Sequence, residues 1–250
     1  MFVDELWRYP VKSMGGERAD DVTVTERGVH LDRAWGLRDV VSNTILSAKR
    51  EGRLLRARAS IVNDQLSVTL PDGRLYDPGP ALDESLGRWL ERDVRLVEAE
   101  AYGLPVFQGV EDFERDDAPL TSWEGTLGAF VDESPLHLVT TGDLAQLARE
   151  RPDLNWDVRR FRPNVVIDAP LVSRLAWEKG QRLAIGEVEV EVTKGCTRCV
   201  MTTRAQPGGM ARELDVLRHV ARDHDARVGV RARVTRPGVA RVGDAVTSVS

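Results

Sequence analysis

The sequence predicts a β-rich α+β fold in two parts, and three observations support this. Short runs of alternating or β-branched residues recur through the 250-residue chain, as they do in small barrels and sandwiches. Apolar residues at helical spacing predict separate helices between these runs, the clearest at Ala81–Leu90. An acidic stretch from Gly109 to Pro119 changes the composition and is typical of a linker or a mobile lid. We therefore expect domains at residues 1–110 and 111–250.

The composition limits the classes of function. Hydrophobic residues make up 42% and charged residues 30% of the chain, as in ordinary globular proteins, and the formal net charge is −5. That balance argues against nucleic-acid binding and against an anionic membrane surface as partner. The start of the sequence lacks the basic and apolar regions of a signal peptide, and no apolar run approaches the ~20 residues of a membrane span. Two cysteines do not form a disulfide scaffold, so we expect a cytoplasmic protein.

The first part reads as strands with one helix. Phe2–Tyr9 alternates and ends at Pro10, which predicts the first strand. A hairpin is predicted where Gln65–Leu70 meets Pro71-Asp72-Gly73. The remaining strand-like runs are Val22–Val24, Val29–Leu31, Leu37–Val41, Ile61–Val62 and, after the helix, Asp93–Val97.

Two short motifs in this part carry candidate ligand contacts. The turn Tyr9–Gly16 holds a lone lysine, Lys12, beside a hydroxyl and two glycines, which suits an anion site or a plain turn with a solvated lysine. Asp32-Arg33-Ala34-Trp35 places a charge pair beside an aromatic residue. It fits a local salt bridge on a strand, or an arginine that faces a ligand.

The second part opens with a strand at Leu136–Thr140 and a helix capped by Thr141-Gly142-Asp143. Arg160-Phe161-Arg162-Pro163-Asn164 then leads into a buried strand, Val165–Ile167. Regular strand geometry would put Arg160 and Arg162 on one side. Asn164 follows a proline, so we expect it at a sheet edge or where the chain joins the sheet. The two arginines and the asparagine suit a phosphate or heterocycle, or a solvated strand face.

Both cysteines follow a strand at Glu187–Val192 that has one wet face. Cys196 and Cys199 enclose Arg198, and a thiol beside fixed cations is biased toward thiolate, the form that acts as nucleophile and metal ligand. Spacing alone leaves a disulfide, a nucleophile and a zinc site open. Zinc would need two more ligands. The candidates are His219 and His224, but no finger pattern precedes them. They lie on or just past a predicted helix whose core face carries Met210, Leu214, Leu217 and Val220.

Two further strands are predicted at the end of the sequence, at Val228–Val234 and Val239–Val246.

Four motifs in this order resemble the MOSC family. They are Tyr9-Pro10-Val11-Lys12-Ser13, Asp32-Arg33-Ala34-Trp35, Arg160-Phe161-Arg162-Pro163-Asn164 and Cys196-Thr197-Arg198-Cys199-Val200-Met201-Thr202-Thr203. The closer resemblance is to members with an N-terminal β-barrel domain ahead of the MOSC domain, a group that includes the amidoxime-reducing component and its bacterial relatives. The resemblance implies a small N-terminal β-barrel-like domain followed by an MOSC β-barrel domain with peripheral helices.

The resemblance also implies a site. By matching to the family pattern, Cys199 would bind the metal of a molybdenum–molybdopterin cofactor and would be the catalytic cysteine. The pterin and its phosphate would be held by Lys12, Ser13, Arg33, Ser134, Arg162, Asn164, Thr197 and Arg198. A soft thiolate suits a transition metal, and arginine, lysine and hydroxyl groups suit the phosphate dianion.

The implied function is reduction of N-hydroxylated or N-oxygenated small molecules. No cysteines remain for an iron–sulfur cluster, so the electrons would come from a separate protein of the ferredoxin or flavoprotein type. The alternatives are a sulfurtransferase or a molybdenum cofactor carrier that uses Cys199. Two positions depart from the family pattern: Arg204-Ala205-Gln206-Pro207 replaces an acidic Asp-Pro segment, and Glu133 replaces a hydroxyl residue beside Ser134.

Overall fold

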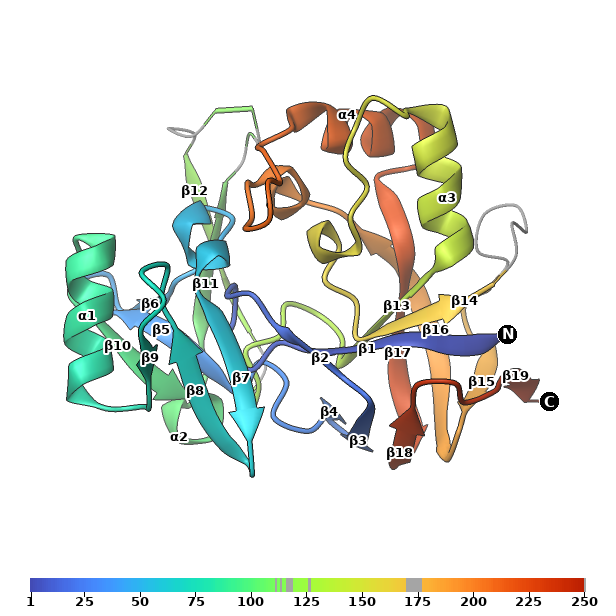
Figure 1. Ribbon diagram of the computed structural model, residues 1–250, viewed down its shortest axis with the longest axis horizontal. Helices are drawn as coiled ribbons and strands as arrows, with labels where there is room; N and C mark the ends of the chain where they lie inside the picture. Colours follow the sequence, from blue (N-terminus) through green and yellow to red (C-terminus); the bar gives the residue numbers. More distant parts are fainter. Residues whose placement is uncertain (111, 113, 116–118, 126, 170–176, 250) are drawn as a thin grey trace.

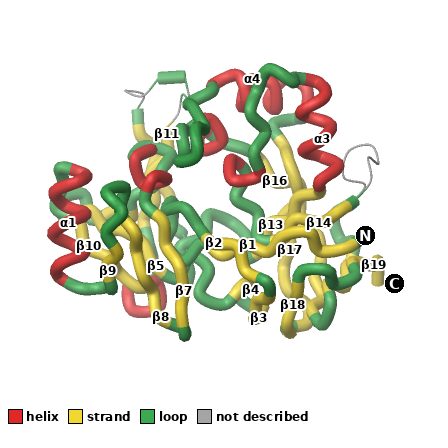
Figure 2. Tube along the Cα trace, viewed as in Figure 1, coloured by secondary structure: helices red, strands yellow, loops and turns green. Residues whose placement is uncertain are grey.

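Two β-rich halves lie side by side along the long axis of the molecule, with the longer helices toward the outside (Figures 1 and 2). The structure is a computed structural model that describes residues 1–110, 112, 114–115, 119–125, 127–169 and 177–249. The β-rich α+β class predicted from the sequence is confirmed. Much of the predicted linker, Gly109–Pro119, lies outside the described residues, so the boundary near residue 110 stays a proposal.

In the described part of the chain, the largest sheet has eight strands in the order β19-β15-β16-β17-β13-β14-β1-β2. All described neighbours in it are antiparallel except β13 and β14, which are parallel. The strands are β1 (Phe2–Arg8), β2 (Glu17–Ala19), β13 (Leu136–Thr140), β14 (Val165–Asp168), β15 (Arg182–Ile185), β16 (Val188–Thr197), β17 (Arg227–Arg236) and β19 (Val246–Val249).

The hydrophobic pattern explains how this sheet packs. In β16, Val188, Val190 and Val192 are buried while the glutamates between them are partly exposed, as the alternation predicted. Strand β14 lies between β13 and β1, so Asn164 stands where the chain joins an interior strand rather than at an edge. The valines of β16 pack in one core cluster with apolar residues of β1, β13 and β14.

The first half contains two smaller sheets around its own core. Helix α1 (Pro80–Leu90) buries Leu82, Leu86 and Leu90 against them, which confirms the predicted amphipathic helix. The predicted hairpin after Gln65 is present as β8 and β9. The other elements are β5 (Trp35–Asp39), β6 (Thr44–Ile45), η1 (Gly52–Arg56), β7 (Arg58–Val62), β8 (Gln65–Thr69), β9 (Leu75–Tyr76), β10 (Val94–Glu98), α2 (Ala99–Tyr102), β11 (Val106–Val110) and β12 (Leu120–Glu124).

The start of the chain is built into the second half. Strand β1 pairs with β14, and β3 (Asp21–Thr25) pairs with both β4 (Gly28–Val29) and β18 (Gly238–Arg241). The backbone amide of Val246 donates to the carbonyl of Met1 at 2.8 Å, which holds the two termini together, as Figure 1 shows. The N-terminal residues therefore run along the junction between the halves, where the candidate site lies.

Several local predictions are corrected by the structure. Arg160 ends a 3-10 turn, η2 (Val158–Arg160), and Arg162 has a left-handed backbone with φ of 53°, so these arginines do not share a strand face. The predicted strand Val239–Val246 is split between β18 and β19, which belong to different sheets. The last helix, α4 (Leu214–Asp223), starts after Met210.

The N-cap of helix α3 (Thr141–Glu150) lies one residue before the predicted cap, Thr141-Gly142-Asp143. Thr140 is the N-cap, and its side chain and that of Asp143 each bond the other's backbone amide, a capping box. Helices α3 and α4 cover the same end of the second half, above the large sheet in Figure 1.

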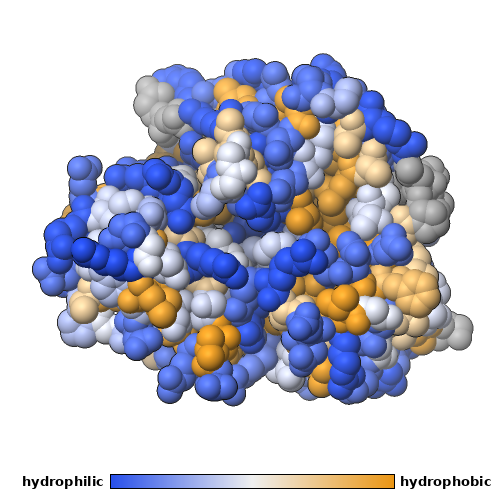
Figure 3. Space-filling model, viewed as in Figure 1, coloured by the Kyte–Doolittle hydropathy of each residue, from blue (hydrophilic) through white to orange (hydrophobic). Residues whose placement is uncertain are grey.

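No helix among the described residues is long and apolar enough to cross a membrane. Figure 3 shows hydrophilic residues over most of the face it presents, with apolar groups scattered between them.

Candidate functional site

One pocket at the junction of the two halves brings together every site residue predicted from the sequence. The β1–β2 turn, the turn before β5, the segments flanking β13 and β14, and the end of β16 all contribute to it. Its lining includes Lys12, Ser13, Arg33, Ser134, Arg162, Asn164, Thr197, Arg198 and Cys199, together with Phe130, Val131, Asp132, His137, Arg160, Phe161, Cys196, Met201 and Arg231.

Lys12 is buried in the wall of this pocket, so the alternative of a solvated turn lysine is wrong. Its Nζ donates to Asp132 Oδ1 at 2.6 Å and to the Phe130 carbonyl at 3.0 Å, and lies 4.0 Å from the centroid of the Phe107 ring. Burial lowers the pKa of Lys12, and the charge of Asp132 opposes that effect. Burial also acts to raise the pKa of Asp132, but Lys12 and Lys49 hold it well below its usual range.

Tyr9 lies between two guanidinium groups. Arg33 is 4.6 Å and Arg162 is 4.1 Å from its ring centroid, so both arginines make cation–π contacts with one aromatic ring. Arg33 also pairs with the buried carboxylate of Asp32, so the salt bridge predicted from the sequence and the pocket-facing arginine are both present, on a turn rather than on a strand. Burial, aided by the charge of Arg33, lowers the pKa of Arg162 to about 10.

Several predicted residues are bonded within the fold. Arg162 Nη1 donates to the Met14 carbonyl at 2.6 Å. The Ser13 hydroxyl accepts from the Ala48 amide at 2.9 Å. Asn164 Oδ1 accepts from the His137 amide at 3.2 Å, and its Nδ2 donates to the Trp7 carbonyl at 3.4 Å. These bonds fix the shape of the pocket wall and join the β1–β2 turn to β14.

The two cysteines occupy different environments. Cys196 is 1% exposed at the end of β16, whereas Cys199 is exposed and precedes the short turn η3 (Val200–Thr203). Both are free thiols. The Cys199 carbonyl accepts from the Thr202 amide at 3.0 Å and from the Thr202 hydroxyl at 2.9 Å, which fixes the backbone of the exposed cysteine.

Cys196 lies beside two arginines and a histidine. Arg198 Nη1 lies 2.8 Å from its Sγ and 3.3 Å from His137 Nε2, and Arg231 lies opposite His137 on the neighbouring strand β17. Burial alone raises the pKa of the Cys196 thiol, but Arg198, His137 and Arg231 outweigh burial and lower that pKa to about 5. Cys196 is therefore a thiolate at neutral pH.

The pocket has an excess of positive charge. Six cationic side chains line it, against the carboxylate of Asp132 and the thiolate of Cys196. The Nε of Arg198 is buried and has no hydrogen-bond partner among the described residues, so a donor is left for a ligand. The enclosed volume is about 100 Å³. This is below the roughly 300 Å³ of a drug-sized site. The enclosed part therefore suits an anionic end group, such as the phosphate of a cofactor that extends beyond it.

Arg160 and Arg204 hold the segments around the pocket together. Arg160 is fully buried, and its guanidinium donates to the carbonyls of Asn155, Thr202 and Ala211 and to Glu213 at 2.6 Å. It is therefore neither on a solvated face nor paired with Arg162. Arg204 Nη2 donates to the Lys49 carbonyl at 2.6 Å, which joins the segment after the cysteines to the first half.

Sequence reasoning missed several pocket residues. Asp132, His137 and Arg231 carry no local motif, and their roles depend on partners more than 30 residues away. Glu133, the departure beside Ser134, lies 3.0 Å from Arg231 Nε and 3.2 Å from Lys194 Nζ.

The zinc alternative built on both cysteines is wrong. Among the described residues, the group that could hold a metal contains His219 and His224 with Glu150, and neither cysteine. The two histidines also do not line the pocket that holds the cysteines.

Two protein-family models match the chain, one over each half. The family model described as the MOSC N-terminal beta barrel domain matches residues 1–102, and the one described as the MOSC domain matches residues 127–247. The chain is 27% identical over 233 residues to mitochondrial amidoxime reducing component 2 of Bos taurus, covering 80% of this chain and 66% of that protein. It is 29% identical over 214 residues to molybdenum cofactor sulfurase of Caenorhabditis briggsae, covering 80% of this chain and 28% of that protein.

The chain thus spans just under two thirds of the bovine relative and less of the nematode one. Among solved structures, the YuaD protein of Bacillus subtilis aligns with 98% of this chain and 93% of its own, at 10% identity and a TM-score of 0.46.

Proposed function

The chain is an MOSC domain protein with an MOSC N-terminal β-barrel domain, and from this premise we propose that it is a molybdenum cofactor-binding oxidoreductase. The observation that carries the proposal is the convergence of all nine residues implied by the family resemblance on one cation-rich pocket. They come from segments as far apart as Lys12 and Cys199. A shared pocket is what a shared ligand requires.

The pocket chemistry fits the anionic part of such a cofactor. Arg198 offers its unpartnered Nε, and Arg33 Nη2 makes only a long bond of 3.3 Å to the Arg162 carbonyl. Guanidinium groups in this position would bind a phosphate through charge-assisted hydrogen bonds. Lys12, Ser13 and Asn164 would hold the wall that orients these arginines, with Ser134 and Thr197 supplying hydroxyls at the pocket lining.

Cys199 is proposed as the metal ligand and the catalytic cysteine. It is an exposed residue of the pocket lining, while Cys196 is buried and in contact with Arg198. A thiolate is a soft ligand that suits a transition metal. When bound, the cofactor would supply two-electron oxygen-atom chemistry, and the protein would supply position, charge and a restricted opening.

We propose small N-hydroxylated or N-oxygenated molecules as substrates and a separate ferredoxin or flavoprotein as electron donor. The names of the amidoxime-reducing relatives support this class of substrate. Both cysteines are used at the pocket, so the described chain has no thiols left to hold an iron–sulfur cluster. A reducing compartment such as the cytoplasm would keep the two thiols free.

The proposal is tested by supplying purified protein with a chemical reductant and an amidoxime or N-hydroxyguanidine and measuring the amidine or guanidine product. Wild-type protein is expected to turn over these substrates, and Cys199→Ser is expected to lose the activity. Bound pterin with no turnover of any N-hydroxylated substrate would favour a cofactor carrier instead.

A second candidate function, sulfur transfer, is favoured by one observation: the low pKa of the Cys196 thiol beside Arg198. In that reaction a thiolate attacks the outer sulfur of a donor persulfide, and the donor leaves as its own thiolate. The sequence-based version of this alternative used Cys199, whereas the environment favours Cys196 as the ionised thiol. Mass spectrometry after exposure to a persulfide donor shows which cysteine carries an added sulfur. No added sulfur on either cysteine would contradict this function.

A further inference from the structure

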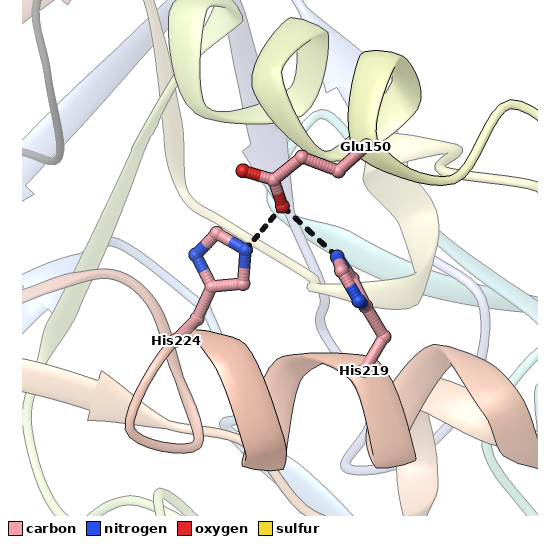
Figure 4. Close-up of side chains that lie close together, drawn as sticks. All are labelled: Glu150, His219 and His224. Atoms are coloured by element: carbon pink, nitrogen blue, oxygen red, sulfur yellow. Dashed lines mark hydrogen bonds and ion pairs between the residues drawn. The ribbon is translucent and has the colours of Figure 1, made fainter.

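Two histidines and a carboxylate meet between helices α3 and α4 of the second half (Figure 4), and none of the three lines the cofactor pocket. Glu150 is the last residue of α3, His219 lies within α4, and His224 is the C-cap residue directly after α4. Glu150 Oε2 lies 2.9 Å from His219 Nε2 and 2.6 Å from His224 Nε2. One carboxylate oxygen is therefore shared by two imidazoles.

His219 faces a second carboxylate on its other side. Its Nδ1 lies 2.8 Å from Asp223 Oδ2, at ion-pair distance although outside hydrogen-bond geometry. A neutral imidazole has one N–H donor and cannot donate to two carboxylates at once. With a metal ion at Nε2, the single N–H of a neutral His219 would lie at Nδ1, beside Asp223.

We propose that Glu150, His219 and His224 form a binding site for a zinc-class divalent metal ion that joins the ends of α3 and α4. Two imidazole nitrogens and one carboxylate oxygen are a donor set that Zn²⁺ uses with a fourth position left open. The donor atoms all lie within 4.8 Å of one another. Ligands of a tetrahedral zinc ion are about 3.3 Å apart, so a small rotation of Glu150 away from the imidazoles makes the space.

The surroundings are those of a metal site. Gln146 Nε2 donates to Glu150 Oε1 at 2.8 Å and orients the carboxylate. With a metal at His219 Nε2, a small side-chain rotation would align the Nδ1–H with Asp223 Oδ2, now 2.8 Å away, and complete the carboxylate–histidine–metal arrangement that fixes the tautomer of a ligand histidine.

The helices that carry the ligands are held by a common core. Leu147 of α3 and Val216 and Val220 of α4 pack in one cluster with Trp156. The Trp156 ring lies 5.7 Å from the His219 ring, centroid to centroid. The ligand backbones are therefore fixed, and only side-chain adjustment is needed to bind an ion.

A cavity next to the proposed site could supply the fourth ligand of a bound ion. Gln146 and His224 also line a cavity of about 240 Å³ that runs toward Arg227 and Val230 of β17. That volume admits a water or a small ligand to a bound ion.

Calorimetric titration of the chelator-treated full chain with Zn²⁺ tests the proposal. About one ion per chain is expected at this site. Thermal unfolding with saturating Zn²⁺ should show an increase in Tm of at least ~2 °C, because the ion binds only the folded state. Glu150→Gln and His224→Gln are each expected to weaken binding by about 100-fold, and Asp223→Asn by about 10-fold. His30→Gln is the matched control, since His30 is 47% exposed and pairs only weakly, 3.9 Å from Asp64.

Free thiols can also bind added Zn²⁺, so the titration is repeated in Cys196→Ser/Cys199→Ser. Binding that persists there and is lost on adding Glu150→Gln supports the proposal. Co²⁺ gives an independent readout, because it should quench fluorescence in wild type and not in Trp156→Phe. Equal Zn²⁺ affinity in wild type and His224→Gln, with both variants folded by circular dichroism, would overturn the proposal, as would binding that disappears with the cysteines alone.

Discussion

Arg198 Nη1 lies 2.8 Å from Cys196 Sγ, and the same guanidinium donates through Nη2 to the Phe161 carbonyl at 2.7 Å. One arginine thus connects the buried thiol to the segment that precedes β14. The contact with Arg198 gives Cys196 a different environment from Cys199, although the sequence distinguishes the two cysteines only by their positions. Cys196 is an ionised, buried thiol, and Cys199 is an exposed thiol of the same pocket lining.

The first prediction concerns the ionisation of Cys196. Thiolate absorbance that disappears in Cys196→Ser should titrate near pH 5 in the folded wild type. In Arg198→Gln, which removes the contact of 2.8 Å, the midpoint should move toward the ordinary value of about 8.5. A wild-type midpoint at that ordinary value would show that the cations around Cys196 do not control it.

The same shift predicts a pH dependence of stability. The pKa of Cys196 is lower in the folded state, so the folded chain holds fewer protons than the unfolded chain between about pH 5 and pH 8.5. The stability of wild type relative to Cys196→Ser should therefore increase with pH across this window, by up to ~1.4 kcal/mol per pH unit. Urea unfolding of both proteins at several pH values measures it, and a flat difference would contradict it.

The second prediction assigns Arg160 a structural role. Arg160→Met should lower the free energy of unfolding by about 3–5 kcal/mol, because Glu213 and several carbonyls lose a fully buried partner. The adjacent Arg159 is the control: it pairs with Asp157 nearer the surface, so Arg159→Met should cost less than about 1 kcal/mol. Similar midpoints in urea for both variants would contradict this.

The third prediction concerns the Lys12–Asp132 pair, which joins the β1–β2 turn to the segment before β13. Asp132→Asn should destabilise the protein by roughly 2–3 kcal/mol, less than a fully buried pair, because the Asp132 side chain is 29% exposed. Lys12→Met in the same chain should cost less than the sum of the two single changes. Strict additivity in this double-mutant cycle would show that the two groups are not coupled.

This pair also has a predicted pH dependence. The pKa of Asp132 is depressed in the folded state, so its contribution is complete above the unfolded value of about 4 and is lost as the pH falls below it. Acid unfolding of wild type should therefore be steeper than that of Asp132→Asn.

The sequence was sufficient for features that depend on local periodicity. The valine–glutamate alternation of β16 predicted its buried and exposed faces, and the apolar spacing of α1 predicted that helix. Family motifs identified pocket residues on both halves, and all of them line one pocket.

Features that depend on tertiary contacts could not be predicted in this way. The backbone of Arg162 is left-handed and η2 precedes it, which strand spacing cannot indicate. Asp132 is recognised as a pocket residue only through its hydrogen bond from Lys12, 120 residues earlier in the sequence. The cluster of Glu150 with His219 and His224 exists because α3 and α4 end at the same place, and the sequence separates these residues by about 70 positions.

The most direct test of the central claim is the molybdenum content of the purified chain and of its two cysteine variants. We expect about one molybdenum per chain in wild type and in Cys196→Ser, with pterin fluorescence on denaturation, and loss of the metal in Cys199→Ser. Wild-type protein prepared with cofactor supplied that contains neither molybdenum nor pterin, or a Cys199→Ser variant that retains the metal, would contradict the account.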